Sequence, residues 1–133
     1  MGDARIIDQN IYALAPGNSL NMLAGMGWNN NDTILVNIGN GPPANLSPVI
    51  EDAEFPHTKL LVTDITVDHF NRIWIVISRI KNLVTVEHEL YYHDLDWAKL
   101  EIIPGEENIV SMKADRRNGI LYVLTSHTLY RIR

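Results

Sequence analysis

The sequence contains no cysteine, which excludes a disulfide-stapled scaffold and any metal site built on thiolates. Basic residues are scarce as well: 11 Lys and Arg stand against 16 Asp and Glu, a formal net charge of -5. No dense basic run is available to neutralise phosphates. The longest apolar runs, such as residues 73–77, are far shorter than the ~20 residues that span a bilayer. We therefore expect a soluble chain whose partners are neither nucleic acid nor membrane.

Strand-forming segments dominate what is present. Short β-branched and aromatic runs recur between clusters of Gly, Asn, Asp and Pro, and no long segment keeps a helical period. With 133 residues, of which 46% are hydrophobic, the chain can bury a core of its own. We predict a single β domain over residues 1–133. The expected strands are residues 4–7, 11–15, 20–24, 33–38, 60–67, 73–78, 89–94, 99–103, 109–114, 120–125 and 128–133.

Three segments of the chain are similar to one another, and each runs from a strand through Asp and Asn into an aromatic strand. The copies are centred on Asp8, Asp68 and Asp115. The second and third copies are 47 residues apart and the first and second are 60 apart, so the first interval has 13 extra residues. Residues 39–51 account for the difference, because this segment carries two adjacent prolines and has a loop-like composition. We predict a protruding inserted loop there.

The repeat units have the size of propeller blades. Each full copy is followed by a hairpin and a further strand, which gives four antiparallel strands at a period near 47 residues. The units cover about residues 4–38, 60–103 and 109–133, and the third ends one strand short. We predict an all-β fold, a partial β-propeller of about three four-stranded antiparallel blades with the last incomplete. A β-sandwich with chance similarity between strands is the alternative.

The repeated motif resembles a step of known propeller repeats. The Asp-x-x-Asn-x-Ile-Trp-Ile-Val pattern of residues 68–76 is similar to the Asp-x-x-Gly-x-(Ile/Leu)-(Trp/Tyr)-Val pattern of NHL, sugar-lactonase-like and sensor-kinase ectodomain blades. The resemblance implies that Asp68 closes the turn between the innermost strand and the next, and that Trp74 packs between blades. Asn71 stands where Gly is usual, and Asn tolerates the left-handed conformation. Gly119 of the third copy comes one position later than the family pattern.

No group of residues has the spacing of a catalytic or metal site. His88 and His93 are five positions apart, which places them on opposite faces of a strand and not one helical turn apart. Asp94 and Asp96 share a strand face but lack the Gly and distal Glu of an EF-hand, so we interpret them as a solvated turn. Neither a nucleophile elbow nor a phosphate-binding glycine loop is present. We predict a protein that is not an enzyme and uses no metal or cofactor.

Two tryptophans lie in polar surroundings. Trp28 follows Gly27, and Trp97 follows Asp96. A Trp in a polar loop is an interface anchor or a sugar-stacking platform, or it folds back over the core. The turn after the first of them is rich in oxygen ligands and hydrogen-bonding groups, and consists of Asn29, Asn30, Asn31 and Asp32. In a carbohydrate-binding protein, the two indole rings would stack on sugars and this turn would bind hydroxyl groups.

The open edge of the third unit favours an assembly function. A missing fourth strand leaves a template for pairing with another chain, so we favour a non-enzymatic structural protein, a subunit of a larger complex or virus particle. The expected interface residues are Trp28, Trp97, Leu129, Tyr130, Arg131 and Arg133. The partner is a second copy or, as the positive charge of this edge favours, a different protein subunit with acidic groups.

Two other functions remain as alternatives. One is a carbohydrate-binding propeller lectin that uses the tryptophans and the Asn-rich turn. The other is a lactonase-like hydrolase, whose metal would have to be held by carboxylates near a ring centre. Only Asp8, Asp64 and Asp68 come near such positions.

Overall fold

The computed structural model describes residues 11–17, 21–27, 33–39, 42–50, 58–81, 85–101, 108–115 and 117–133. Within these ranges the protein forms three antiparallel sheets and no helix. Sheet A contains β1 (Ile11–Pro16), β2 (Met22–Met26), β3 (Leu35–Ile38) and β4 (Ala44–Asn45). Sheet B contains β5 (Thr58–Val67), β6 (Ile73–Lys81), β7 (Thr85–Asp94) and β8 (Asp96–Leu100). Sheet C contains β9 (Ile109–Asp115), β10 (Ile120–Thr125) and β11 (Leu129–Ile132).

The prediction of an all-β fold is confirmed. In every sheet the strands lie side by side in chain order, so each sheet is built from hairpins. The sheets have four, four and three strands. The sheet with three strands is the last one along the chain, as the sequence repeat predicted. The predicted strand at residues 4–7 lies outside the described residues. No helix in the described part of the chain is long and apolar enough to cross a membrane.

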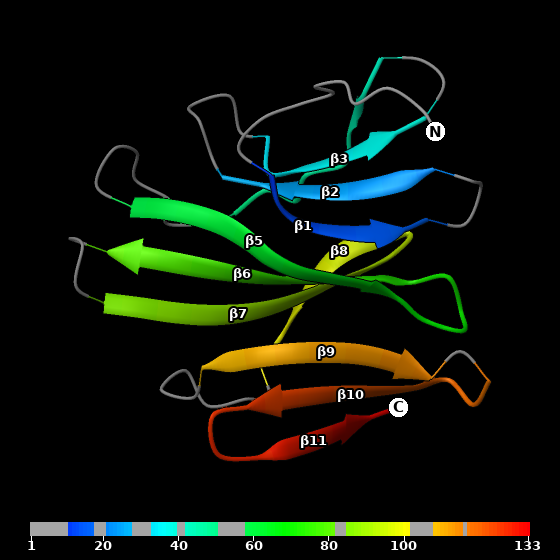
Figure 1. The fold of residues 1–133 in the computed structure, drawn as a ribbon, viewed down its shortest axis with the longest axis vertical. Helices are drawn as coiled ribbons and strands as arrows, with labels where there is room; N and C mark the ends of the chain where they lie inside the picture. The colour runs from blue at the N-terminus through cyan, green and yellow to red at the C-terminus, as the bar shows by residue number, and fades with distance from the viewer. Residues whose placement is uncertain are drawn as a thin grey trace, which may run out of the picture.

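The three sheets follow one another along the longest axis of the molecule, with sheet B in the middle (Figure 1). Strand β6 explains this arrangement, because its apolar run leaves both of its faces hydrophobic. Ile75 and Ile77 on one face join the core shared with sheet A. Trp74 and Val76 on the other face join the core shared with sheet C, together with Met112. Sheet B is therefore covered on both sides.

The segment predicted as a protruding loop is in part built into sheet A. Residues 44 and 45 form β4 and pair with β3. Ser47 Oγ accepts the backbone N–H groups of Ile34 and Leu35 at 2.8 and 3.1 Å, and Leu46 and Ile50 pack against the core between sheets A and B. The prediction is wrong for this part of the segment, because it adds a strand to sheet A and its Leu46 and Ile50 side chains are partly buried. Counting residues locates an insertion but does not show which way it packs.

The turn between β5 and β6 is organised by Asp68, whose side chain is 1% exposed. Its Oδ1 accepts the backbone N–H groups of Phe70 and Arg72 at 2.8 and 3.0 Å, and its Oδ2 accepts Nε1–H of Trp74 at 2.8 Å. Burial alone would raise the pKa of Asp68, but the hydrogen bonds from Trp74 and Arg72 and the Arg72 charge outweigh it and lower that pKa. Asn71 has a φ of 63°. The expected turn-closing role of Asp68 and the left-handed conformation of Asn71 are both confirmed.

The turn between β9 and β10 repeats this arrangement with a shift of one residue. Asp115 Oδ1 accepts the backbone N–H of Arg117 at 3.0 Å, and the positive φ, 72°, falls on Gly119. A side chain at Gly119 would lie 2.7 Å from the ring of Phe70, which belongs to the preceding turn. Successive turns of sheets B and C therefore contact one another, and the glycine makes room for that contact.

Trp74 is buried as predicted, with 3% of its surface exposed. Its ring stacks on Tyr92 of β7 with centroids 4.9 Å apart, and it packs in the core shared by sheets B and C. Trp74 thus joins the turn of Asp68 to the contact between two sheets.

Candidate functional site

The outward face of sheet C, on the side away from sheet B, carries exposed apolar side chains. Leu124 and Leu129 lie directly opposite one another in neighbouring strands and are 44% and 64% exposed. Val110 of β9 is exposed at the register shift opposite Leu124 and Thr125. Lys113 and Arg131 are exposed, and both pair in register with Tyr122. We call the following six residues the outward face of sheet C: Val110, Lys113, Tyr122, Leu124, Leu129 and Arg131. It is apolar at one end and basic at the other.

The opposite end of the stack is also apolar. Leu14 of β1 and Met22 of β2 are 62% and 40% exposed on the side of sheet A that faces away from sheet B. By contrast, the exposed large hydrophobic residues among the described part of sheet B and its turns are Phe70 and Leu95, which both lie in turns. Exposed apolar side chains on strands therefore belong to the two end sheets.

The predicted interface residues of the last strand divide between its two faces. Leu129 and Arg131 point outward and are exposed, and Arg133 after the strand is exposed too. Tyr130 is half-buried and packs against the core between sheets B and C. Side chains alternate along a strand, so a single edge strand cannot present all of these residues to one partner surface. The order of sheet C ends at β11.

Trp97 lies over the core and contributes little outward surface. Its Nε1–H donates to the carbonyl oxygen of Leu46 at 2.9 Å, its ring meets His93 edge-on with centroids 5.1 Å apart, and it packs against the core of sheets A and B. This is the arrangement in which the indole ring folds back over the core. Trp28 and the Asn-rich turn of residues 29–32 lie outside the described residues.

The carboxylates considered for a lactonase-like centre are bonded to the backbone. Asp64 Oδ1 accepts the N–H of Ile65 at 3.0 Å, and its Oδ2 accepts the N–H of Met112 in β9 at 2.7 Å. Asp68 closes its turn, and Asp8 lies outside the described residues. In the described part of the chain no group of three or more His, Asp or Glu side chains is placed to hold a metal ion. The observed role of Asp64 is to tie sheet C to sheet B.

A row of charges that is buried at Arg79 and exposed at Lys99 crosses sheet B and was not recognised from the sequence. Glu89 of β7 pairs with Arg79 of β6 at 3.0 Å and with Lys99 of β8 at 2.7 Å. Burial alone would raise the pKa of Glu89, but the hydrogen bonds and charges of these two cations lower it. Burial and the Glu89 charge raise the pKa of Tyr91 beside them. The row is satisfied internally, which is typical of a structural ion network.

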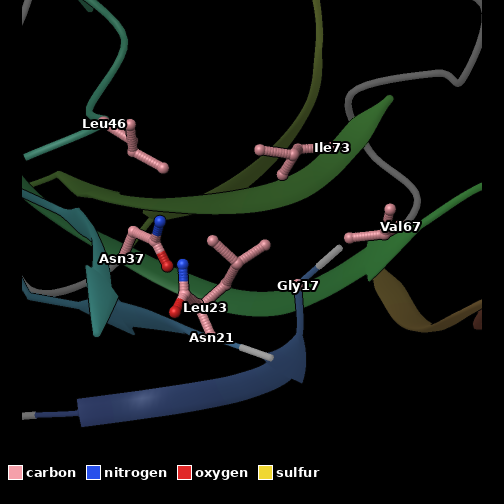
Figure 2. Close-up of a pocket in the computed structure, with 7 residues that line it drawn as sticks. All are labelled: Gly17, Asn21, Leu23, Asn37, Leu46, Val67 and Ile73. Carbon is pink, nitrogen blue, oxygen red and sulfur yellow. The ribbon is translucent and has the colours of Figure 1, made fainter. Parts of the chain in front are cut away.

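A pocket of about 150 Å³ opens where sheets A and B meet (Figure 2). Its polar groups are the side chains of Asn21 and Asn37, which lie beside Leu23 in the close-up. Asn37 Oδ1 is buried and has no hydrogen-bond partner in the described part of the structure. The residues that line the pocket are Gly17, Asn21, Leu23, Asn37, Leu46, Val67 and Ile73.

The pocket was missed from the sequence for a physical reason. Asn37 stands near the end of a predicted strand, where polar residues are ordinary. The alternation of side chains along the strand could have indicated the pocket. Leu35 and Asn37 share a strand face, so Asn37 occupies a position on the core side of β3.

No family model, no curated protein and no solved structure matches this chain.

Proposed function

We propose that this protein is a non-enzymatic structural or assembly subunit whose three sheets are consecutive blades of a propeller-like stack. The stack continues onto other protein subunits at its ends. The observation that carries the proposal is the contrast between the sheets. Sheet B is covered on both faces, sheet C exposes large apolar side chains on its outward face, and sheet A exposes Leu14 and Met22 at the margin of an outward face whose middle is buried. Exposed apolar patches of this kind mark interaction surfaces.

Two features support the arrangement as blades. Each sheet is an up-and-down series of strands in chain order, and β5 and β9, the first strands of sheets B and C, are neighbours. The repeated Asp turns lie at the same place in these two sheets, and Trp74 fills the space between them. A β-sandwich consists of two sheets, so it would not require a third sheet packed on the free face of the second sheet.

A second copy of the chain is the occupant that fits both ends. Strands β1 to β4 contain no charged residue, so the exposed part of the outward face of sheet A, at Leu14 and Met22, is neutral and apolar. It can cover Leu124 and Leu129 without placing like charges beside Arg131. A head-to-tail dimer buries both end faces and brings six sheets together. Closed propellers have about four to eight blades, so two copies suffice to close a ring.

Light scattering of the purified chain and of Leu129→Asp tests this proposal. We expect a mass above that of the monomer for the wild type and a shift towards monomer for the variant, because a carboxylate would be buried among apolar groups. Leu95→Asp is the matched control: Leu95 is exposed in a turn of sheet B and should leave the mass unchanged. A wild-type chain that remains monomeric at every concentration overturns the second copy as the partner.

A further inference from the structure

Asn37 breaks the pattern of the strand on which it lies. Leu35 and Asn37 of β3 share the face that packs towards sheet B, and Asn37 stands opposite Leu23 of β2, a residue of the core between the two sheets. Strand alternation would place an apolar residue at this position. Positions that break a local rule without a compensating partner are the ones where binding sites are expected.

The buried oxygen of Asn37 lacks a partner. Buried side-chain oxygens are almost always hydrogen-bonded, since leaving one without a partner is unfavourable. Asn37 Oδ1 has none in the described residues and lies in the wall of the pocket. A ligand that donates a hydrogen bond would satisfy it.

A second amide faces the same space. Figure 2 shows the side chains of Asn21 and Asn37 directed towards one another beside Leu23. A side chain at Gly39 would lie 2.7 Å from Asn21 Oδ1. The absence of a side chain at Gly39 therefore leaves room for the Asn21 amide. The rest of the wall is hydrocarbon and comes from both sheets.

We propose that this pocket binds a neutral six-membered ring that carries hydroxyl groups, such as a cyclic polyol or a neutral pyranose. None of the described residues that line it is charged, which favours a neutral ligand. The unpartnered oxygen requires a donor, and the wall of Leu23, Leu46, Val67 and Ile73 requires an apolar ring face. The volume of about 150 Å³ matches a cavity that holds benzene in another protein, so the pocket takes the ring and part of its substituents lie outside it.

The site is independent of the proposed assembly. It lies between sheets A and B, and Leu129 is on sheet C. The Leu129→Asp variant should therefore bind the same ligand as the wild type. If a variant loses the dimer but still binds the ligand, or loses ligand binding but still forms the dimer, the two proposals are distinguished.

NMR titration with three neutral probes tests the site: cyclohexanol, myo-inositol and methyl α-glucopyranoside. We expect the side-chain amide signals of Asn21 and Asn37 to shift saturably with at least one probe, with a Kd on the order of 1 mM or tighter. Comparison of the last two probes distinguishes a free polyol from a pyranose. Cyclohexanecarboxylate, the charged counterpart, should bind at least about tenfold more weakly.

Three variants complete the test. Asn37→Leu removes the acceptor and should weaken binding at least about tenfold while its melting temperature stays the same or rises. Asn108→Leu makes the same change at an exposed position outside the pocket and should bind like the wild type. Gly39→Ala displaces the Asn21 amide and should weaken binding in a folded chain.

Three results would overturn the site. They are the absence of a saturable shift with all three probes, unchanged binding by Asn37→Leu, and a lower melting temperature of that variant, which would show that the amide supports the fold. If Asn37→Leu does not fold, unchanged binding by Gly39→Ala overturns the site as well.

Discussion

The two interfaces of sheet B are built in different ways. The interface with sheet A is a close approach of aliphatic side chains and backbone: Gly27 and Leu61 form a bridge between the sheets, and a side chain at Gly25 would lie 2.4 Å from Val62. The interface with sheet C has a mainly aliphatic core around Trp74, and two backbone N–H groups of β9 donate across it to side chains, one to Asp64 and one to His88. Close packing dominates the first interface, which has one indole N–H bond across it, from Trp97 to Leu46. In the second interface two backbone N–H groups of one strand are bonded across it, one of them to a titratable imidazole.

The largest effect is expected from Trp74→Ala in the interface with sheet C. The change removes a buried ring and leaves Asp68 without one of its donors, so we expect a loss of roughly 3–5 kcal/mol in the free energy of unfolding. Denaturant unfolding measures it. Trp97→Ala is the comparison in the other interface, where the ring is only half-buried, and should cost less. If Trp74→Ala lowered the free energy of unfolding by no more than Trp97→Ala, the comparison would be contradicted.

Gly25→Ala should have an intermediate effect and is specific to the interface with sheet A. The added methyl group would lie 2.4 Å from Val62 Cγ1 and 3.1 Å from its carbonyl oxygen. We expect a loss of roughly 1–3 kcal/mol from overpacking, measured by thermal or denaturant unfolding.

A double variant decides whether steric contact is the cause. Val62→Ala removes the nearest atom, Cγ1, and leaves Cβ at 2.7 Å, so in the Gly25→Ala background it should cost less than in the wild type. Strictly additive losses would show that the close approach at Gly25 does not depend on Val62.

The smallest effect is a dependence of stability on pH that arises at the interface between sheets B and C. Burial lowers the pKa of His88 from its ordinary value of 6.5, and its Nδ1 accepts the N–H of Ile109 at 2.8 Å, which requires that nitrogen to be unprotonated. The unfolded chain then takes up the proton more readily than the folded chain. Stability from this group is present above pH 6.5 and is lost as the pH falls through the lowered pKa.

Unfolding measured between neutral and mildly acidic pH checks this dependence. His88→Gln should flatten it in that range, whereas His127→Gln, at an exposed position, should not. The lowered pKa values of Asp68 and Glu89 act in a separate window below about pH 4, where stability falls as these carboxylates take up protons. A wild-type profile that is flat down to that window would contradict the assignment to His88.

The sequence predicted the features that depend on local chemistry. The apolar run of β6 indicated a strand buried on both faces, and the repeated Asp and Asn indicated a turn that needs a left-handed residue. The four strands of sheet B and the three of sheet C followed from the repeat, whereas the fourth strand of sheet A is β4, which lies in the segment predicted as a loop.

Features that depend on contacts between distant segments were not predictable in the same way. Leu46 became part of a core because it meets Trp97, 51 residues away. Arg79, Glu89 and Lys99 form an ion row only because three strands align in register. Asn37 lines a pocket only because sheet B covers that face of sheet A. Each of these depends on tertiary packing, which a local pattern does not specify.

The bond between Trp97 and Leu46 has a consequence for how the molecule opens. It ties the last strand of sheet B to the segment after the last strand of sheet A, while the bridge between Gly27 and Leu61 ties the same two sheets elsewhere. Local unfolding proceeds in cooperative units that share such connections. We therefore expect sheets A and B to act as one unit in amide exchange, and sheet C, whose polar ties include a titratable imidazole, to be the part that separates while the other two stay closed.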